Sequence, residues 1–329
     1  MTALSQAGLR RLALCLLAAI AVAPLDSARA QADGTPLRLI VPLPTGSTTD
    51  VVARLIAEEL RRGLARPVVI DNRPGAAGRI AADALMKSKP DGSTFLFTPM
   101  ALPVLIPLVF KDIKFDPFRD FAPVAQITSF EYALVVSADH PARTIEEFLA
   151  WVKANPANAT YGTPAAGSAP HFIGTMLAKA GNAPMLHVPY RGAANVEVDV
   201  AGGQLAAGIS ALSDFYAWHR DGKLRILATF GPRRTPLTPE VPTAAERGYA
   251  SLVTLGWHAV FAPSGTSQAA IDRASKVIGD ALATREMRER LAGMGLIADY
   301  AAPDAFAARL TADYAQWREI VKATGFVAE

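Results

Sequence analysis

Residues 37–50, LRLIVPLPTGSTTD, are the stretch that decides the fold class. Its first five residues form an apolar run that predicts a buried strand. Its last seven, residues 44–50, are rich in Gly, Ser and Thr and predict a loop. Apolar residues then recur at helical spacing, with charged residues between them, at Val52, Leu55, Ile56 and Leu60. A strand, a loop and an amphipathic helix in this order form the basic unit of an α/β fold.

The same unit recurs along the chain. Further apolar runs predict strands at residues 68–70, 94–97, 133–136, 159–162, 186–190, 205–209, 226–229 and 259–263. Helical spacing predicts helices near residues 80–87, 144–154, 268–282, 286–294 and 303–323. Strands that alternate with helices predict mostly parallel sheets with right-handed crossovers. Because the pattern restarts near residue 133 and the chain has 329 residues, we expect two domains.

A second loop of the same kind spans residues 163–171, TPAAGSAPH. Like residues 44–50, it follows a predicted strand and opens a predicted helix. The first backbone N–H groups of a helix have no partner within the helix, and the aligned peptide dipoles add roughly half a positive charge there. A helix start is therefore a site that suits an anion. Two such loops in different domains predict that a carboxylate is held between two lobes.

The first thirty residues have the pattern of a secretory signal. Arg10 and Arg11 precede an apolar run at residues 12–25, and residues 28–30, ARA, form a small-x-small cleavage site. The apolar run is shorter than the roughly 20 residues that a membrane-spanning helix needs. We therefore expect cleavage after Ala30 and a periplasmic mature protein.

The mature chain is expected to lack cysteine, because the single cysteine, Cys15, lies in the leader. This excludes disulfides, thiolate metal sites and thiol nucleophiles, so the fold must rest on a sizeable core. The 33 basic and 30 acidic residues of the whole chain nearly balance, and no long basic run occurs. This composition does not favour a nucleic-acid partner.

Seven short motifs characterise the chain beyond these patterns. They are residues 39–54 (LIVPLPTGSTTDVVAR), 72–78 (NRPGAAG), 167–168 with His171, 187–192 (HVPYRG), 202–204 (GGQ), 222–225 (GKLR) and 241–243 (VPT). Their order and spacing resemble those of the periplasmic solute-binding proteins of tripartite tricarboxylate transporter systems, the Bug family. The resemblance covers nearly all of the mature chain. It implies a receptor that captures a small carboxylate and delivers it to the permease subunits of such a transporter.

The resemblance implies a two-lobed fold like that of type II periplasmic binding proteins, in which each lobe is a mostly parallel sheet flanked by helices. Lobe one is expected at residues 35–128 plus 257–329, and lobe two at residues 129–256. The ligand would lie in the cleft between the lobes, which agrees with the general rule that ligands bind beyond the carboxyl ends of parallel strands. The two crossings of the chain would form the hinge, where we expect residues 130–132 and Trp257 to pack.

The resemblance also assigns a ligand carboxylate to the two loops, with ordered waters taking part. The matching residues are Ser47, Thr48 and Thr49 in the first loop and Gly167, Ser168 and Ala169 in the second. Thr163, at the start of the second loop, is a further candidate ligand contact. Hydroxyl and backbone N–H groups are suitable donors, since a charge-assisted hydrogen bond contributes roughly 1.5–3 kcal/mol. The alternative is that the hydroxyls only cap the two helices.

Three departures from the family pattern concern the ligand. Where the family often has an aspartate after the strand that follows GGQ, this chain has Ser210, and we expect Asp214 to cap a helix or to face solvent. Where many relatives have a Thr-His segment, residues 98–103 (TPMALP) are apolar. Ser47 and Thr48 replace a Gly-Gly pair of the first loop. These departures predict a carboxylate ligand with an apolar or aromatic body.

Other polar residues lie near the second loop. Tyr190 and Arg191 are at the end of a predicted strand and are further candidate ligand contacts. Arg191 has two interpretations: it binds a second ligand carboxylate, for which a guanidinium is suited, or it forms an ion pair at the cleft edge. His171 lies in the first turn of a predicted helix, where we expect it to support the helix cap.

The main alternative to a binding protein is a secreted hydrolase. Ser168 and His171 lie three residues apart, but this spacing does not set an imidazole against a serine oxygen with a third residue to orient it. The five histidines show no His-x-x-x-His metal spacing, and no Gly-x-Ser-x-Gly elbow occurs. We therefore predict a monomeric binding protein with no enzyme activity, metal or cofactor. A receptor that docks on a sensor kinase, instead of a permease, has the same sequence requirements.

Overall fold

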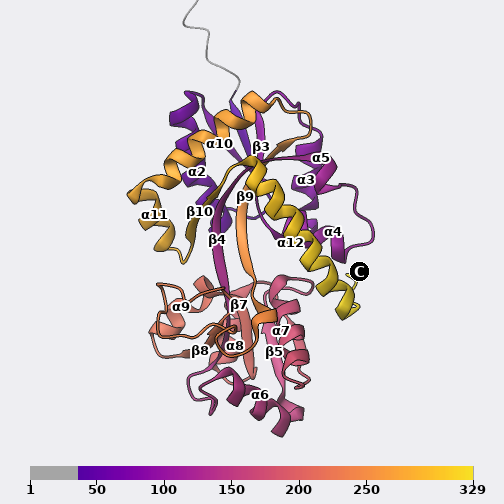
Figure 1. The fold of residues 1–329 in the computed structure, drawn as a ribbon, viewed down its shortest axis with the longest axis vertical. Helices are drawn as coiled ribbons and strands as arrows, with labels where there is room; N and C mark the ends of the chain where they lie inside the picture. The colour runs from indigo at the N-terminus through magenta and orange to yellow at the C-terminus, as the bar shows by residue number, and fades with distance from the viewer. Residues whose placement is uncertain (1–35, 329) are drawn as a thin grey trace, which may run out of the picture.

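The computed structural model describes residues 36–328, so the predicted signal at residues 1–30 and its cleavage after Ala30 lie outside the described residues. Figure 1 shows two bodies joined by two long strands, with the C-terminal helix against the joint. Within residues 36–328, the helices fall short of the length and apolar character needed to cross a membrane.

The first body contains the parallel strands that the opening stretch predicts. In sheet order they are β2 (Val68–Asn72), β1 (Leu37–Val41) and β3 (Thr94–Pro99). The helices that cover this sheet are α2 (Thr48–Leu64), α3 (Arg79–Met86) and α10 (Gln268–Ala283). Val52, Ile56 and Leu60 of α2 are fully buried in one core cluster with Leu39 of β1, because their helical spacing places them on one face.

The second body repeats this arrangement. Its parallel strands, in sheet order, are β6 (Leu186–Pro189), β5 (Thr160–Thr163) and β7 (Ala207–Ala211). Its helices are α6 (Ile145–Ala154), α7 (Ala169–Ala180), α8 (Ala193–Ala201) and α9 (Leu212–Arg220), and β8 (Leu224–Thr229) extends the sheet. The two loops singled out from the sequence follow β1 and β5, at the carboxyl ends of strands in both bodies.

Two strands run through both bodies and join them: β4 (Phe121–Ser137) and β9 (Leu255–Pro263). They pair antiparallel with each other, and β4 also pairs antiparallel with β10 (Ile297–Ala301), β7 and β8. The two-lobed α/β fold class is thus confirmed, with parallel sets in both bodies and antiparallel pairs contributed by the crossing strands. The expected lobe limits, 128/129 and 256/257, fall inside β4 and β9 and stay a prediction.

The C-terminal helix α12 (Pro303–Thr324) packs against β4 and α7 and so touches both bodies. Trp317 of α12 meets Phe172 of α7 with 6.1 Å between the ring centroids. The remaining helical elements are α4 (Ile106–Val109), α5 (Pro117–Asp120), α11 (Arg285–Ala292), a π-helix at Ala101–Leu105, and 3₁₀ turns at Ala76–Gly78, Pro156–Asn158 and Ala250–Leu252.

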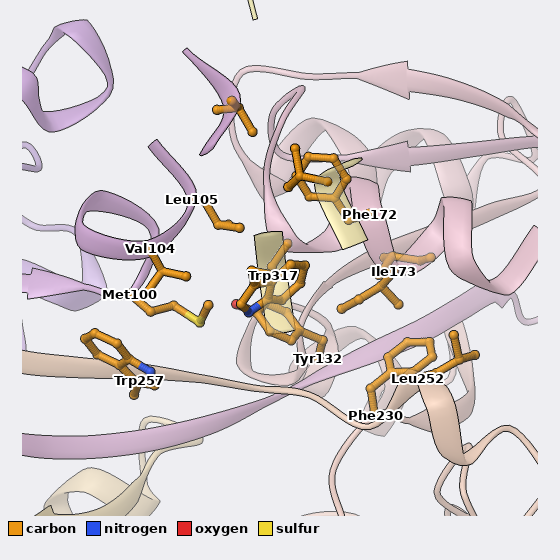
Figure 2. Close-up of a cluster of buried hydrophobic side chains, with 14 of the residues drawn as sticks. Met100, Val104, Leu105, Tyr132, Phe172, Ile173, Phe230, Leu252, Trp257 and Trp317 are labelled. Carbon is orange, nitrogen blue, oxygen red and sulfur yellow. The ribbon is translucent and has the colours of Figure 1, made fainter. Parts of the chain in front are cut away.

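One hydrophobic core cluster extends from the first body into the second. Figure 2 shows Met100, Val104 and Leu105 from the first body facing Trp317, with Phe172 and Ile173 beyond it. Trp257 of β9 has an exposed fraction of 0 % and lies in this cluster, and its Nε1–H donates to Asp313 Oδ2 at 2.7 Å. This confirms that Trp257 packs in an interlobe core. The two bodies therefore share one packed core.

Candidate functional site

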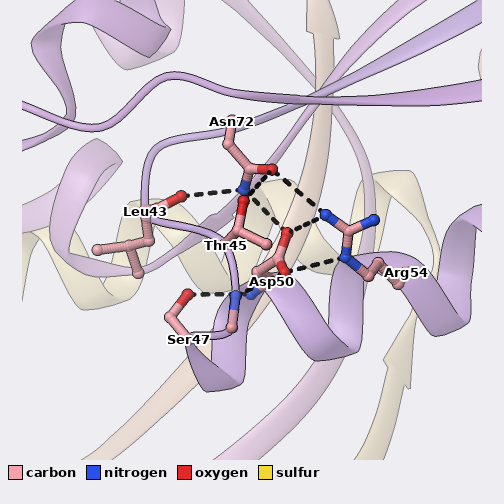
Figure 3. A network of polar contacts seen from close by, with 7 residues as sticks. Leu43, Thr45, Ser47, Asp50, Arg54 and Asn72 are labelled. Atoms are coloured by element: carbon pink, nitrogen blue, oxygen red, sulfur yellow. Dashed lines mark hydrogen bonds and ion pairs between the residues drawn. The ribbon is translucent and has the colours of Figure 1, made fainter.

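The first loop is held in place by a buried carboxylate. Figure 3 shows Asp50 at its centre: Oδ2 accepts the Gly46 N–H at 2.9 Å and pairs with Arg54 at 3.0 Å, while Oδ1 accepts from Asn72 at 2.9 Å. Burial opposes ionisation, but the hydrogen bonds from Arg54, Gly46 and Asn72 outweigh it and hold the pKa of Asp50 below its usual value. The Asp50 N–H donates to Ser47 Oγ at 3.2 Å, so Ser47 caps α2.

The three candidate residues of the first loop have different surroundings. Thr48 is exposed, whereas Thr49 has an exposed fraction of 5 % and bonds through Oγ1 to His258 Nε2 at 3.2 Å. The other ring nitrogen of His258 lies 2.9 Å from Thr128 Oγ1. Burial lowers the pKa of His258 to about 4, so the ring is neutral at pH 7. The Thr49 hydroxyl thus ties α2 to β4 and β9, and the backbone N–H groups of Thr48 and Thr49 are the donors that the cap leaves for a ligand.

The second loop closes on itself in a similar way. Ser168 caps α7: its Oγ accepts the His171 N–H at 3.4 Å and donates to Ala165 O at 2.7 Å. Gly167 adopts φ +69°, which favours glycine, and its N–H donates to His171 Nδ1 at 3.1 Å. This contact confirms that His171 supports the cap. At this helix start Pro170 has no N–H, and the His171 N–H is bound to Ser168 Oγ. The backbone N–H groups of Ser168 and Ala169 are the donors that the cap leaves for a ligand.

Three candidate hydroxyls of the second body are already paired inside it. Thr163 Oγ1 donates to Ala165 O at 3.1 Å and lies 2.7 Å from His187 Nε2. The Tyr190 hydroxyl donates to Asp199, and burial together with this carboxylate raises the pKa of Tyr190 to about 12. The Ser210 hydroxyl donates to Asp214.

Asp214 forms part of the start of α9. Its carboxylate accepts from Ser210 and from the backbone N–H of Ala211. Of the two expectations for Asp214, a helix cap or a solvent-facing side chain, the first is confirmed. Burial raises the pKa of Asp214, and the Ser210 hydrogen bond only partly offsets this effect. Ser210 itself has an exposed fraction of 2 %. The pair stabilises the helix start beneath the surface of the second body.

Arg191 lies beside the second loop. The flanking backbone fixes it there, because the Tyr190 N–H donates to Thr163 O and the Gly192 N–H donates to Pro164 O, both at 2.9 Å. The side chain is exposed, and within residues 36–328 we find no ion pair or hydrogen bond that it makes. The ion pair expected as one interpretation is thus not formed within the described chain.

A cavity of about 300 Å³ is lined by residues of both bodies and includes the second loop. From the first body it is lined by Pro42, Leu43, Ala77, Gly78, Pro99, Ala101, Leu102, Leu105, Ile106, Val109 and Phe110, and from the second by Ala165, Ala166, Gly167 and Ser168. The lining carries no charged side chain. A larger cavity of about 470 Å³, near His140 and Gln204, is lined by the second body alone and does not include the second loop.

Of the candidate residues, Gly167 and Ser168 line the 300 Å³ cavity between the two bodies. The others lie outside its lining: Ser47, Thr48, Thr49, Thr163, Ala169, Tyr190, Arg191 and Ser210. The apolar segment at residues 98–103 does contribute, through Pro99, Ala101 and Leu102. Residues 105–110 were not expected at the site, since no pattern in the sequence shows that they face residues 165–168. Gly78, which also lines the cavity, belongs to the NRPGAAG motif, so the sequence did contain a signal for it. Its φ of +88° lies in the region that favours glycine.

One cation lies at the edge of the cavity. The Arg79 guanidinium carbon is 4.6 Å from the centroid of the Phe110 ring, and Arg79 Nε–H donates to Ala76 O at 2.9 Å. Phe110 lines the cavity, and Arg79 follows the lining residues Ala77 and Gly78. A basic group therefore accompanies an otherwise uncharged lining.

The arrangement of Ser168 and His171 does not match a nucleophile and its base. The Ser168 hydroxyl donates to Ala165 O, and His171 Nδ1 accepts from Gly167. A hydrolytic pair needs the imidazole to accept from the serine hydroxyl. Across the described residues, His, Cys, Asp and Glu do not gather into a group of three or more that could hold a metal ion.

Comparison with known proteins identifies the family of this chain. The profile of the tripartite tricarboxylate transporter family receptor matches residues 52–326. Protein BugT of Bordetella pertussis is 33 % identical over 291 residues, which are 88 % of this chain and 89 % of that protein.

Two solved structures are similar along most of their length. R. palustris Rpa4515 with adipate has a TM-score of 0.80 and 29 % identity, covering 89 % of this chain and 98 % of that one. MatC (Rpa3494) from Rhodopseudomonas palustris with bound malate has a TM-score of 0.75 and 26 % identity, covering 87 % and 98 %. The chain belongs to the tripartite tricarboxylate transporter family of receptors, a family of solute-binding proteins.

Proposed function

We propose that this protein is a periplasmic receptor that captures a small carboxylate between its two bodies and delivers it to the permease subunits of a tripartite transporter. The observation that carries the proposal is a cavity lined by residues of both bodies, with the capped start of α7 in its lining. The capped start of α2 follows the lining residues Pro42 and Leu43 along the chain. The adipate and malate named for two similar structures are carboxylates, which supports the same ligand class.

The carboxylate would accept hydrogen bonds from backbone N–H groups at the two helix starts. Residues Thr48 and Thr49 supply such groups on one side, and Ser168 and Ala169 on the other. The side-chain hydroxyls then play unequal parts: Ser168 lines the cavity, whereas Thr49 and Thr163 are occupied by histidines. Ordered water completes the contacts, as the family resemblance implies. The helix dipoles favour the negative charge at both starts.

The body of the ligand would be apolar. Apart from Ser168, the lining side chains that face the cavity are aliphatic, aromatic, proline or glycine. A second carboxylate buried against this surface would lose hydration without gaining a partner, which is costly. The exposed Arg191 and the rim residue Arg79 are the cations that could balance one at the edges. An aliphatic or aromatic monocarboxylate therefore fits the cavity better than a compact dicarboxylate.

Ligand capture would work as a hinged clamp. The proposed lobes, residues 35–128 plus 257–329 and residues 129–256, meet along β4 and β9. A ligand that touches both lobes binds the closed form more tightly than the open form, and only this difference shifts the equilibrium between them. The closed monomer then presents a distinct surface to the permease.

A thermal-shift screen of the mature chain tests the ligand class. The probes are benzoate, hexanoate, adipate and malate, with a simple amine and a neutral sugar as controls. A carboxylate at about a hundred times its dissociation constant adds about 2.7 kcal/mol of stability, which raises Tm by roughly 5–10 °C in a chain of this size. A rise with the neutral sugar alone would contradict the carboxylate assignment.

The variant Ser168→Trp tests the place of binding. Its indole would fill the cavity beside Gly167, so the Tm shift should disappear while the ligand-free protein stays folded. Circular dichroism of the ligand-free variant provides the folding control. Unchanged affinity would remove the second loop from the binding site.

A further inference from the structure

Two histidines stack directly behind the second loop. His171, in the first turn of α7, and His187, in β6, have ring centroids 3.9 Å apart and an interplanar angle of 15°. The edge of Phe326, from the C-terminal tail, meets the His171 ring at 4.9 Å between centroids, and Tyr161 lies 5.0 Å from His187. Both histidines are half-buried, and the proposed capture mechanism does not use their side chains.

The hydrogen bonds define where each ring carries its proton. Gly167 N–H donates to His171 Nδ1 at 3.1 Å, so this nitrogen carries no proton and the neutral ring is protonated at Nε2. Thr163 Oγ1 uses its only hydrogen on Ala165 O, so His187 Nε2, 2.7 Å away, must be the donor to that oxygen. Both neutral rings therefore have the Nε2–H tautomer.

These two contacts support opposite ends of the turn that lines the cavity. His171 holds the Gly167 N–H directly, and His187 holds Ala165 through the Thr163 hydroxyl. Ala165 and Gly167 both line the cavity. We propose that His171 and His187 are positioning residues for carboxylate capture, and that a proton on His171 Nδ1 displaces the second loop and weakens binding. This inference rests on the proposed binding function of that loop.

The surroundings favour neutral rings at pH 7. Burial lowers the pKa of His171, and burial together with His171 lowers the pKa of His187 to about 4. The groups facing the pair are Tyr161, whose hydroxyl donates to His171 O, Thr163, Thr175, and the Phe172 and Phe326 rings. None of these carries a charge at neutral pH, and two stacked imidazolium rings would repel each other.

The sign of the pH effect follows from the acceptor role of Nδ1. Binding needs His171 unprotonated, so affinity should be constant above the pKa of His171 in the ligand-free protein. It should fall as the pH drops through that value, which lies below 6.5, by at most tenfold per pH unit for one proton. A bound carboxylate would attract an imidazolium and act in the opposite direction, so the sign of the measured slope separates the two effects.

The ligand-free protein provides the first test. In ¹⁵N-histidine NMR spectra at pH 7.5, His171 should show the Nε2–H tautomer, and the Gly167 amide shift should follow the His171 titration. A proton on His171 Nδ1 at pH 7.5, or a Gly167 amide that ignores the titration, would overturn the proposal. This test needs no ligand, so it stands even if the proposed function fails.

Affinity measured against pH provides the second test, by calorimetry with benzoate and adipate as probes. His171→Asn keeps an acceptor oxygen near the Nδ1 position but does not titrate, so it should bind as wild type at pH 7.5 and lose the acid-dependent weakening. His171→Ala should bind about three- to tenfold more weakly at pH 7.5, since the Gly167 N–H loses its acceptor. The titration of the probe itself is common to all variants.

His140→Asn is the matched control. His140 also accepts a backbone N–H through Nδ1, from Ala142 at 3.1 Å, and burial also lowers its pKa, but it lies at the cavity confined to the second body. It should leave the affinity and its pH profile unchanged. A pH profile of His171→Asn equal to that of wild type would overturn the proposal. If wild type binds neither probe at pH 7.5, the proposed function is contradicted for them and the NMR test alone decides the positioning role.

Discussion

At the scale of single residues, the buried carboxylate of Asp50 fixes the shape of the first loop. Its carboxylate joins the Gly46 N–H, the Arg54 guanidinium and the Asn72 amide, and its own N–H meets the Ser47 cap. With an exposed fraction of 1 %, it is the fixed point around which residues 44–50 fold. The shape of the first loop therefore depends on a residue that does not line the cavity.

Asp50→Ala should lower the free energy of unfolding by about 1–3 kcal/mol, because three donors lose a buried acceptor while the half-exposed Arg54 stays solvated. Urea unfolding at pH 7 measures the change. Since the folded pKa of Asp50 is lowered, its contribution is full above about pH 4 and is lost as the pH falls through the folded value. The difference from wild type should therefore shrink in acid.

Glu58→Ala is the control for Asp50→Ala. Glu58 pairs with Arg61 on the exposed face of the same helix, at 2.7 Å. Surface pairs of this kind contribute little, so no measurable change in the urea midpoint is expected. Equal destabilisation by the two variants would show that the network around Asp50 has no special role.

At the scale of elements, the sequence predicts the strand–loop–helix units well because each is encoded locally. An apolar run, a Gly- and Ser-rich loop and a helical repeat are contiguous at residues 37–60, and β1 and α2 form there. Strand β4 was predicted only at 133–136, although it spans Phe121–Ser137, since Gln126 and Thr128 interrupt the apolar pattern. Strand β10 was missed because its residues are largely exposed or half-buried.

The lining of the cavity between the two bodies was predicted in part for the same reason, and the ligand contacts stay a prediction. Ser168 and Gly167 were found because a cap and a glycine turn have local signatures. The sequence does not reveal that Thr49 and Thr163 point their hydroxyls at histidines, since His258 lies 209 residues from Thr49. Contacts between distant elements, such as residues 105–110 with 165–168, follow from tertiary packing alone.

The C-terminal tail packs on the second loop, and a glycine substitution measures this contact. A Cβ on Gly167 would lie 2.9 Å from Phe326 Cε1, and the φ of +69° adds backbone strain. Gly167→Ala should therefore cost about 1–2 kcal/mol for the strain plus a further ~1 kcal/mol for the contact. At Gly46 the φ is +86° and an added Cβ would meet open space. The variant Gly46→Ala therefore measures the backbone strain alone.

Phe326→Ala completes this measurement. In its background the excess cost of Gly167→Ala over Gly46→Ala should disappear, which a double-mutant cycle from urea unfolding detects. An excess that persists without the Phe326 ring would show that the tail does not press on the loop.

At the scale of the whole molecule, the packing divides the interface between the two bodies into two parts. A shared core that includes Trp257, Trp317 and Phe172 joins them. The cavity between the bodies adjoins this core, because Leu102, Leu105 and Val109 belong to both. A clamp needs both parts: a hinge side that stays packed and a ligand side whose contacts form only when the lobes close.

Calorimetry of the mature protein with matched acid and amide pairs tests most directly whether the cavity between the two bodies selects a carboxylate. The pairs are benzoate with benzamide, hexanoate with hexanamide, and adipate with adipamide. They conserve shape and remove the charge. At least one acid should bind roughly tenfold to a hundredfold more tightly than its amide, which corresponds to one lost charge-assisted hydrogen bond. Amides that bind as tightly as their acids in every pair would contradict carboxylate capture at this site.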